Sequence, residues 1–290
     1  MGGLGEEVRK KLTKKVAFPL LNRLLGGRDE HLYHYSAKMD RLFPIRTFDW
    51  QTYRYLKTGT HDSDRWWRSL RDLGLRGGTI LDVGANTGYT AAWFSTVAER
   101  VYAFEPDPQN VEILREQIRI RGLTNVEVRE TAVGDAAGTV ELHRKERWGH
   151  HALSDVGASR TTGTIEVPCT TVDRVMTEEG IETVTLLTVD VEGFEPEVFR
   201  GAEAGLSSGA IQRVVFEHSP GFYGQRGLDE LAPVTFLEEL GFDLRLPDGT
   251  RFSAGGARKG EQCDLLAFAP GVETWPAGPS TGCLLYTSPS

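Results

Sequence analysis

The residues best suited to chemistry are a glycine-bearing turn and one acidic residue that follows it. The turn is the segment Asp82–Gly88 (DVGANTG), and the acid is Glu105, 21 residues after Gly84. In α/β folds that bind nucleotides, N–H groups of such a turn meet the anionic part of the ligand, and an acid about 20 residues later accepts hydrogen bonds from the ribose hydroxyls. The spacing therefore predicts a pocket for a ligand that contains ribose.

The turn departs from the dinucleotide fingerprint at one position. That fingerprint, G-x-G-x-x-G, needs a second glycine so that the backbone can approach a pyrophosphate, and Asn86 stands at this point. A side chain there disfavours NAD. A ligand that contains ribose and adenine but no phosphate, such as S-adenosylmethionine, needs less room at the turn.

Alternating apolar runs and helical patterns must position these residues. Five short runs suit buried strands: Thr79–Val83, Val101–Phe104, Val126–Val133, Val184–Val191 and Ile211–Glu217. Further strands are expected near 139–143, 164–172, 242–246 and 263–269. The alternation predicts an α/β fold whose mostly parallel sheet binds ligands at the carboxyl ends of its strands.

Five motifs follow one another along this part of the chain. They are DVGANTG, FEPDP (Phe104–Pro108), TAVGD (Thr131–Asp135), DVEGFE (Asp190–Glu195) and VVFEH (Val214–His218). In this order and at these separations they resemble the FkbM family of S-adenosylmethionine-dependent methyltransferases, over roughly Thr79–Ala269. The resemblance implies the class I methyltransferase fold, a Rossmann-like, mostly parallel seven-stranded sheet with helices on both faces. It also implies methyl transfer, usually to a hydroxyl oxygen.

The resemblance further implies which residues would bind the cofactor. Gly84, Asn86 and Gly88 would shape the pocket for the methionine part, Asp82 would meet its amine directly or through water, and Glu105 would hold the ribose. Asp135 would lie near the adenine. The alternative for Asp135 is a turn-forming role before the small residues that follow it.

A second set of polar residues falls at the carboxyl ends of two later strands: Asp190, Glu192, Glu217 and His218. Methyl transfer to a hydroxyl needs an aligned nucleophile and a group that removes its proton. Asp190 or His218 could be that base, with Glu192 orienting the acceptor. Alternatively, Asp190 or Glu192 holds the loop by accepting backbone N–H bonds. A divalent metal on these carboxylates is less favoured because the sequence shows no dedicated set of ligands.

Composition limits the function classes. Hydrophobic residues make up 39% of the 290 residues and charged residues 26%, which is typical of a soluble globular protein, and the formal charge of −8 disfavours binding to nucleic acid. Three dispersed cysteines suggest neither a disulfide framework nor a zinc site. A cytoplasmic location is therefore expected.

The first 28 residues reverse the sign of the charge, with seven basic side chains against two acidic ones. Leu4, Val8, Leu12 and Val16 recur at helical spacing and predict an amphipathic helix. This helix could touch an anionic membrane surface, or it could pack on its own domain with a solvated charged face. No secretory signal is expected, because no small-residue cleavage site follows the short apolar stretch.

Three parts of the chain are expected. Residues 1–78 would form an N-terminal helical extension, residues 79–270 the methyltransferase domain, and residues 271–290 a flexible tail whose last segment, CLLYTSPS, resembles translated adaptor sequence. The expected enzyme is an S-adenosylmethionine-dependent O-methyltransferase that acts on a sugar, a glycolipid precursor or another secondary metabolite. The alternatives are an NAD-dependent oxidoreductase and a cofactor-binding module without catalysis.

Overall fold

The computed structural model describes residues 32–36, 41–45, 75–145, 152–157, 160–256 and 262–273. The chain divides into two compact units, residues 1–67 and 68–290. The expected basic helix at residues 1–28 and most of the expected tail lie outside the described residues. The division into an extension, a methyltransferase domain and a tail therefore stays a prediction.

The first unit contains two described strands, β1 (Leu32–Ser36) and β2 (Arg41–Ile45), which pair antiparallel. For these two segments the prediction of helices is wrong. Both segments are rich in aromatic and apolar residues that favour strands, and Pro44 lacks the N–H that a helix interior needs.

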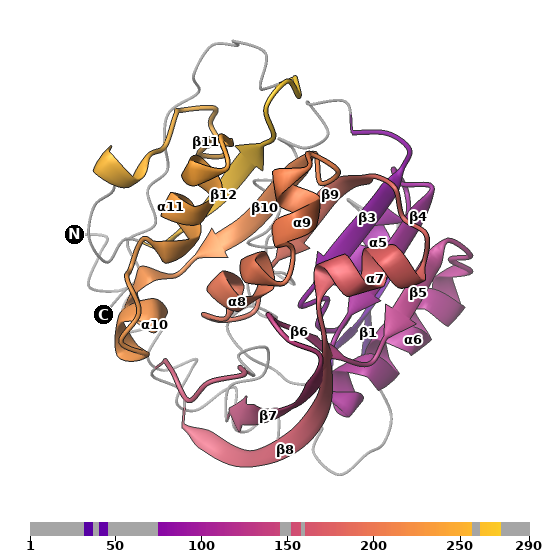
Figure 1. Ribbon diagram of the computed structural model, residues 1–290. Helices are drawn as coiled ribbons and strands as arrows, with labels where there is room; N and C mark the ends of the chain where they lie inside the picture. The colour runs from indigo at the N-terminus through magenta and orange to yellow at the C-terminus, as the bar shows by residue number, and fades with distance from the viewer. Residues whose placement is uncertain are drawn as a thin grey trace, which may run out of the picture. The chain divides into compact units, whose positions relative to one another are not determined.

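The second unit is built on a seven-stranded sheet with the order β11-β12-β10-β9-β3-β4-β5 (Figure 1). Its strands in chain order are β3 (Thr79–Val83), β4 (Arg100–Phe104), β5 (Val126–Arg129), β9 (Val184–Val189), β10 (Arg213–His218), β11 (Asp243–Arg245) and β12 (Cys263–Phe268). Only β12 runs antiparallel to its neighbours β10 and β11, and the other pairs are parallel. This confirms the mostly parallel sheet of the class I methyltransferase fold.

A separate three-stranded sheet has the order β6-β8-β7. Its strands are β6 (Ala132–Val133), β7 (Gly138–Lys145) and β8 (Thr161–Thr170). The prediction of one strand over Val126–Val133 is therefore wrong, because the chain leaves the main sheet after Arg129 and pairs with β8 from Ala132. The break places Thr131 and the residues after it at the carboxyl end of the main sheet.

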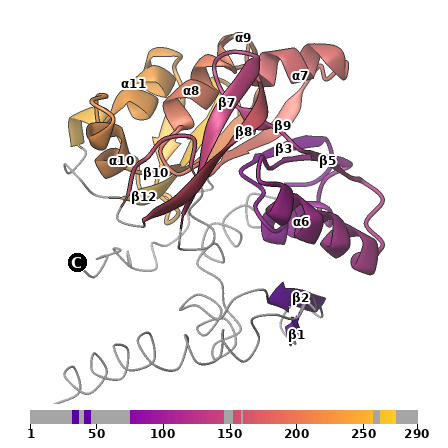
Figure 2. The ribbon, with the colours of Figure 1, turned by 90° about the horizontal axis from the view of Figure 1, so that it is seen from below.

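Helices cover both faces of the main sheet. They are α5 (Tyr89–Phe94), α6 (Pro108–Arg121), α7 (Val172–Glu178), α8 (Glu195–Arg200), α9 (Glu203–Ser207), α10 (Pro220–Gln225) and α11 (Ala232–Glu239), with a short 3-10 helix, η2, at Ala254–Gly256. In Figure 2, α7, α8, α9 and α11 lie on one side of the sheet and α6 lies on the other. No helix in the described part of the chain has both the length and the apolar character needed to cross a membrane.

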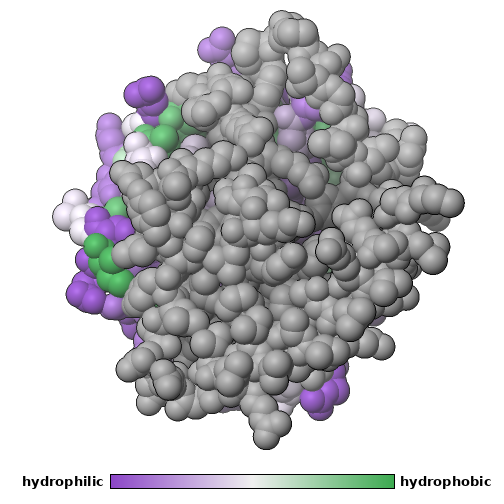
Figure 3. All heavy atoms as spheres, turned by 180° about the vertical axis from the view of Figure 1, so that it is seen from behind, coloured by the Kyte–Doolittle hydropathy of each residue, from purple (hydrophilic) through white to green (hydrophobic). Residues whose placement is uncertain are grey.

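The core packs β9 and β10 against α8. Val198 and Phe199 of α8 are fully buried, and the Phe199 ring meets the Phe216 ring edge to face at 5.1 Å between centroids. On the face seen in Figure 3, the coloured atoms are mainly hydrophilic, with small separate hydrophobic areas. Ile120 of α6 is the one large hydrophobic side chain that is exposed among the described residues, at 38%.

Phe199→Ala tests this packing. The substitution removes a buried aromatic ring and leaves a cavity, so we expect the free energy of unfolding to fall by about 3–5 kcal/mol. Ile120→Ala is the control, because its side chain is partly exposed on a helix, and its effect should stay within about 0.5 kcal/mol. Urea unfolding measures both, and a Phe199 variant as stable as the control would contradict the assigned core.

Candidate active site

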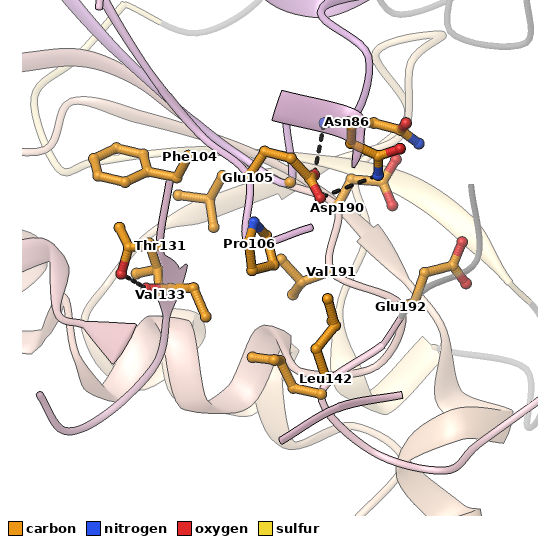
Figure 4. A pocket seen from close by; sticks show the side chains of 15 residues that line it. Asn86, Phe104, Glu105, Pro106, Thr131, Val133, Leu142, Asp190, Val191 and Glu192 are labelled. Atoms are coloured by element: carbon orange, nitrogen blue, oxygen red, sulfur yellow. Dashed lines mark hydrogen bonds between the residues drawn. The ribbon is translucent and has the colours of Figure 1, made fainter. Parts of the chain in front are cut away.

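A cavity opens at the carboxyl ends of β3, β4 and β9 (Figure 4). It contains about 530 Å³ of empty space, part of it open to solvent. The polar residues that line it include Asn86, Glu105, Asn110, Asp190 and Glu192, and apolar side chains from β4, β7 and the loop after β9 complete it.

The glycine turn is held against two other elements by close contact. Gly84 and Gly88 both have positive φ, 86° and 87°. A Cβ on Gly84 would lie 1.9 Å from the carbonyl oxygen of Asp190, and a Cβ on Gly88 would lie 2.3 Å from a methyl carbon of Leu114. The glycines are therefore required both by backbone conformation and by space.

Two non-glycine residues in the described part of the chain have positive φ: Asn86 at 49° and Glu192 at 53°. Both line the cavity. Such backbone conformations are disfavoured for residues with a side chain, and they persist where the surrounding structure holds them. The strained positions therefore lie on the turn and on the loop that face each other across the site.

Glu105 lies at the end of β4 and is the polar centre of the cavity. Its Oε2 accepts a hydrogen bond from the backbone N–H of Asn86 at 2.9 Å. Its Oε1 accepts one from the backbone N–H of Asp107 at 2.9 Å and one from Nδ2 of Asn110 at 3.1 Å. Burial raises the pKa of Glu105 to about 7, although these hydrogen bonds act in the opposite direction.

The loop between β4 and α6 is fixed by Asp107. This buried carboxylate caps α6 by accepting a hydrogen bond from the backbone N–H of Gln109 at 2.7 Å. It also accepts two hydrogen bonds from the guanidinium of Arg144 in β7, at 2.8 and 3.0 Å. This ion pair connects β7 of the three-stranded sheet to the loop after β4, which begins with Glu105.

Asp82 lies next to the cavity but does not contribute to its lining. Its carboxylate accepts hydrogen bonds from the hydroxyls of Thr90 at 2.6 Å and Thr188 at 2.8 Å. Burial raises its pKa to about 6. Its contact with a cofactor amine stays a prediction.

The loop after β9 is held by a residue that the sequence did not single out. Oε1 of the buried Glu195 accepts hydrogen bonds from the backbone N–H groups of Val191 at 3.2 Å and Gly193 at 3.3 Å. This is the loop-holding role that the sequence offered as the alternative for Asp190 or Glu192. The signal available was the third acid in DVEGFE, placed at the first position of a helix.

Arg226, the residue that follows α10, also holds this loop in place. Its guanidinium donates hydrogen bonds to the carbonyl of Gly193 and to both carboxylate oxygens of Glu197, and it lies 5.0 Å above the Phe194 ring. The loop is thereby fixed through its backbone, so the side chains of Asp190 and Glu192 are available to the cavity.

Asp190 and Glu217 form an acidic edge at the ends of β9 and β10. The parallel register pairs Val189 with Phe216, so the next residues, Asp190 and Glu217, are neighbours. Asp190 is exposed to the cavity, yet the protein around it limits its hydration and raises its pKa well above the ordinary value, with the charge of Glu192 adding to the effect. Burial and then the charge of Asp190 raise the pKa of Glu217 in the same way.

The structure does not bring His218 to this cavity. Side chains alternate along β10, so His218 points to the opposite face from Glu217. Its ring packs 5.7 Å from the Tyr223 ring and 6.1 Å from the Phe252 ring, and it is 2% exposed. Burial lowers its pKa to about 4. It is a neutral core residue at pH 7.

Asp135 is also placed away from the cavity lining. It is exposed and forms an ion pair with Arg200 of α8 at 3.3 Å. The TAVGD motif instead supplies Thr131, Ala132 and Val133 to the cavity. The described residues contain no group of three or more His, Cys, Asp or Glu side chains placed to hold a metal ion.

Comparison with known proteins assigns the chain to a family. The model of the methyltransferase FkbM domain matches residues 82–244, which is more than half of the chain. The chain therefore belongs to the FkbM methyltransferase family.

The individual proteins that the chain resembles have low sequence identity to it. The chain is 28% identical over 144 residues to the 2-O-methyltransferase NoeI of Sinorhizobium fredii, a match that covers 44% of this chain and 58% of NoeI. It thus spans little more than half the length of that relative. Two solved structures are similar to it: the methyltransferase FkbM of Methylobacillus flagellatus (15% identity, TM-score 0.45, 66% of this chain and 44% of that chain) and the precorrin-6y C5,15-methyltransferase of Geobacter metallireducens (13% identity, TM-score 0.41, 72% and 89%).

Asp82→Asn tests the electrostatics of the turn. Because burial raises the pKa of Asp82 from 3.8 to about 6, the carboxyl contributes stability below pH 3.8 that is lost as the pH rises through 6. Asparagine carries no charge and can still hydrogen-bond the two threonine hydroxyls. We therefore expect the free energy of unfolding at pH 8 to rise by about 1–3 kcal/mol in this variant.

Urea unfolding of the wild type and the Asp82→Asn variant at pH 8, 6.5 and 5 measures this difference. The gain should shrink as the pH falls, since the wild-type carboxyl becomes protonated. A gain that is the same at all three pH values, or a loss at pH 8, would contradict the raised pKa.

Proposed function

We propose that the chain is an S-adenosylmethionine-dependent methyltransferase that methylates a hydroxyl oxygen of a small acceptor, such as a sugar, a glycolipid precursor or another secondary metabolite. The observation that carries the proposal is the cavity itself. It joins the glycine turn and Glu105 on one side to Asp190 and Glu192 on the other. The name of the relative NoeI, a 2-O-methyltransferase, supports a hydroxyl as the acceptor.

The donor side of the cavity has groups that fit a nucleoside with an amino-acid tail. Glu105 presents a carboxylate to ribose hydroxyls, and Oδ1 atoms of Asn86 and Asn110 are buried without a hydrogen-bond partner among the described residues. Gly84 and Asn86 would border the methionine part, with Asp82 behind the turn. When bound, S-adenosylmethionine supplies an electrophilic methyl group on a sulfonium.

On the acceptor side, we propose Asp190 as the group that receives the acceptor proton and Glu192 as the group that orients the acceptor. Asp190 lines the cavity, and its raised pKa makes it a stronger base than an ordinary aspartate. His218 was the other candidate from sequence. Its low pKa and its aromatic surroundings on the opposite face of β10 favour a packing role instead.

The first experiment separates this function from its alternatives. Isothermal titration calorimetry with S-adenosylhomocysteine and with NAD should show binding of S-adenosylhomocysteine at least tenfold tighter. Acceptor pools incubated with a labelled methyl donor should then yield a methylated product. Tighter binding of NAD would favour an oxidoreductase, and cofactor binding without any product would favour a noncatalytic module.

Glu105→Ala should weaken S-adenosylhomocysteine binding. Hydrogen bonds from ribose hydroxyls to a buried carboxylate are charge-assisted and contribute about 1.5–3 kcal/mol, which corresponds to a loss of roughly 10-fold to 150-fold in affinity. Glu127→Ala is the matched control, because Glu127 forms an exposed ion pair with Arg100 on the edge strand β5. Calorimetry checks both variants, and a change within about twofold for Glu105→Ala would refute its assigned role.

The catalytic assignment is tested with the acceptor found in the labelled-donor screen. Asp190→Asn should lower turnover by roughly 10²-fold to 10⁴-fold with S-adenosylhomocysteine affinity nearly unchanged, as expected for a positioned base. His218→Gln should lower stability more than turnover. The opposite pattern, with turnover lost only in the His218 variant, would make the histidine the base.

A further inference from the structure

Asn110 is a polar residue in the cavity that no sequence motif singled out. It lies in the first turn of α6, is 2% exposed and contributes to the cavity lining. Its Nδ2 donates a hydrogen bond to Oε1 of Glu105, but its Oδ1 has no hydrogen-bond partner among the described residues. A buried amide oxygen without a partner is unfavourable and is uncommon in folded proteins, so it indicates a partner that the described residues do not supply.

The orientation of this amide follows from its neighbours. Oε1 of Glu105 accepts hydrogen bonds from both the backbone N–H of Asp107 and the NH₂ group of Asn110, so the amide oxygen of Asn110 faces away from Glu105. Asp107 and Arg144 fix the start of α6 from the other side. The oxygen is therefore a preorganised acceptor rather than one end of a freely rotating side chain.

The hydrogen-bonding capacity of Glu105 shows why a second acceptor is needed. Each carboxylate oxygen accepts about two hydrogen bonds. Oε1 already accepts from Asp107 and Asn110, and Oε2 accepts from Asn86. One acceptor position remains, on Oε2, whereas the two adjacent hydroxyls of a ribose bring two donors.

We infer that Asn110 binds one ribose hydroxyl of the methyl donor through Oδ1, while Oε2 of Glu105 binds the other. The inference rests on the proposed S-adenosylmethionine site and adds a specificity-determining residue to it. The pair selects a nucleoside with both hydroxyls, since a deoxyribose leaves one buried acceptor unpaired. Sites built to bind a hydroxyl reject analogues that lack it for this reason.

A thermodynamic cycle that combines one substitution in the protein with the removal of one ribose hydroxyl from the ligand tests the contact. Calorimetry measures the affinity of the wild type and of Asn110→Ala for S-adenosylhomocysteine and for its 2′-deoxy and 3′-deoxy analogues. In the wild type each analogue should bind about tenfold or more weakly. In Asn110→Ala the penalty for one analogue should fall to about threefold or less while the penalty for the other persists, because only one hydroxyl loses its partner.

Two further variants make the result specific. Asn110→Ser keeps a small polar side chain in case the alanine variant unfolds, and it should show the same selective loss. Asn125→Ala is the matched control, since its Nδ2 bonds the carbonyls of Ser95 and Ala98, both at 3.0 Å, and Asn125 does not line the cavity. It should lower the melting temperature without changing any of the three affinities.

The outcomes separate this inference from the proposed function. Unchanged penalties for both analogues in the Asn110 variants would overturn the contact while the donor site stands. A fall of both penalties together would also overturn it, because Asn110 would then act only by holding Glu105. If the wild type binds no S-adenosylhomocysteine at all, the proposed function fails and the inference fails with it.

Discussion

The site depends on the contact between the turn after β3 and the loop after β9. The backbone of Gly84 approaches the carbonyl of Asp190 so closely that a Cβ would lie 1.9 Å from it, and the N–H of Asp190 donates to the carbonyl of Val83 at 3.0 Å. Asn86, two residues after Gly84, and Glu192, two residues after Asp190, both have positive φ. The turn and the loop that line the cavity are therefore positioned by one backbone junction, and a change at either strand end would move both.

Around this junction the fold tolerates several buried carboxyl groups. Burial raises the pKa of Asp82 to about 6, and it raises the pKa of both Glu195 and Glu105 to about 7. Each ionised carboxylate in such a place opposes folding, and each is partly compensated by N–H or hydroxyl donors. Glu195 holds the loop through Oε1 and does not line the cavity, whereas Glu105 lines the cavity and has one acceptor position open on Oε2. The difference separates a carboxylate that serves the fold from one that can serve a ligand.

The sheet and the turn could be predicted from the sequence because both depend on the types and spacing of residues that are close together in the chain. All seven main strands lie within a few residues of the strands expected from sequence, although the third was predicted to continue too far, and the spacing from Gly84 to Glu105 placed both at one cavity. Roles that depend on long-range contacts were not predictable in this way. The sequence could not show that the side chain of His218 packs among aromatic rings on the opposite face of β10 from Glu217. The proposed role of Asn110 depends on the hydrogen bond between its amide and Glu105, which the sequence does not show.

The proposed methyl transfer must proceed with a carboxylate as the base. Asp190 and Glu217 are neighbours at the ends of adjacent strands, and the charge of Asp190 raises the pKa of Glu217, as expected for two carboxylates that repel each other. An acceptor hydroxyl is far less acidic than either carboxyl, so full removal of its proton before methyl transfer would cost too much free energy. As the new C–O bond forms, however, the oxygen becomes strongly acidic, and a carboxylate with a raised pKa can take the proton at that stage. The proposed chemistry therefore needs Asp190 ionised and aligned rather than strongly basic. Burial, and then the charge of Glu192, raise its pKa.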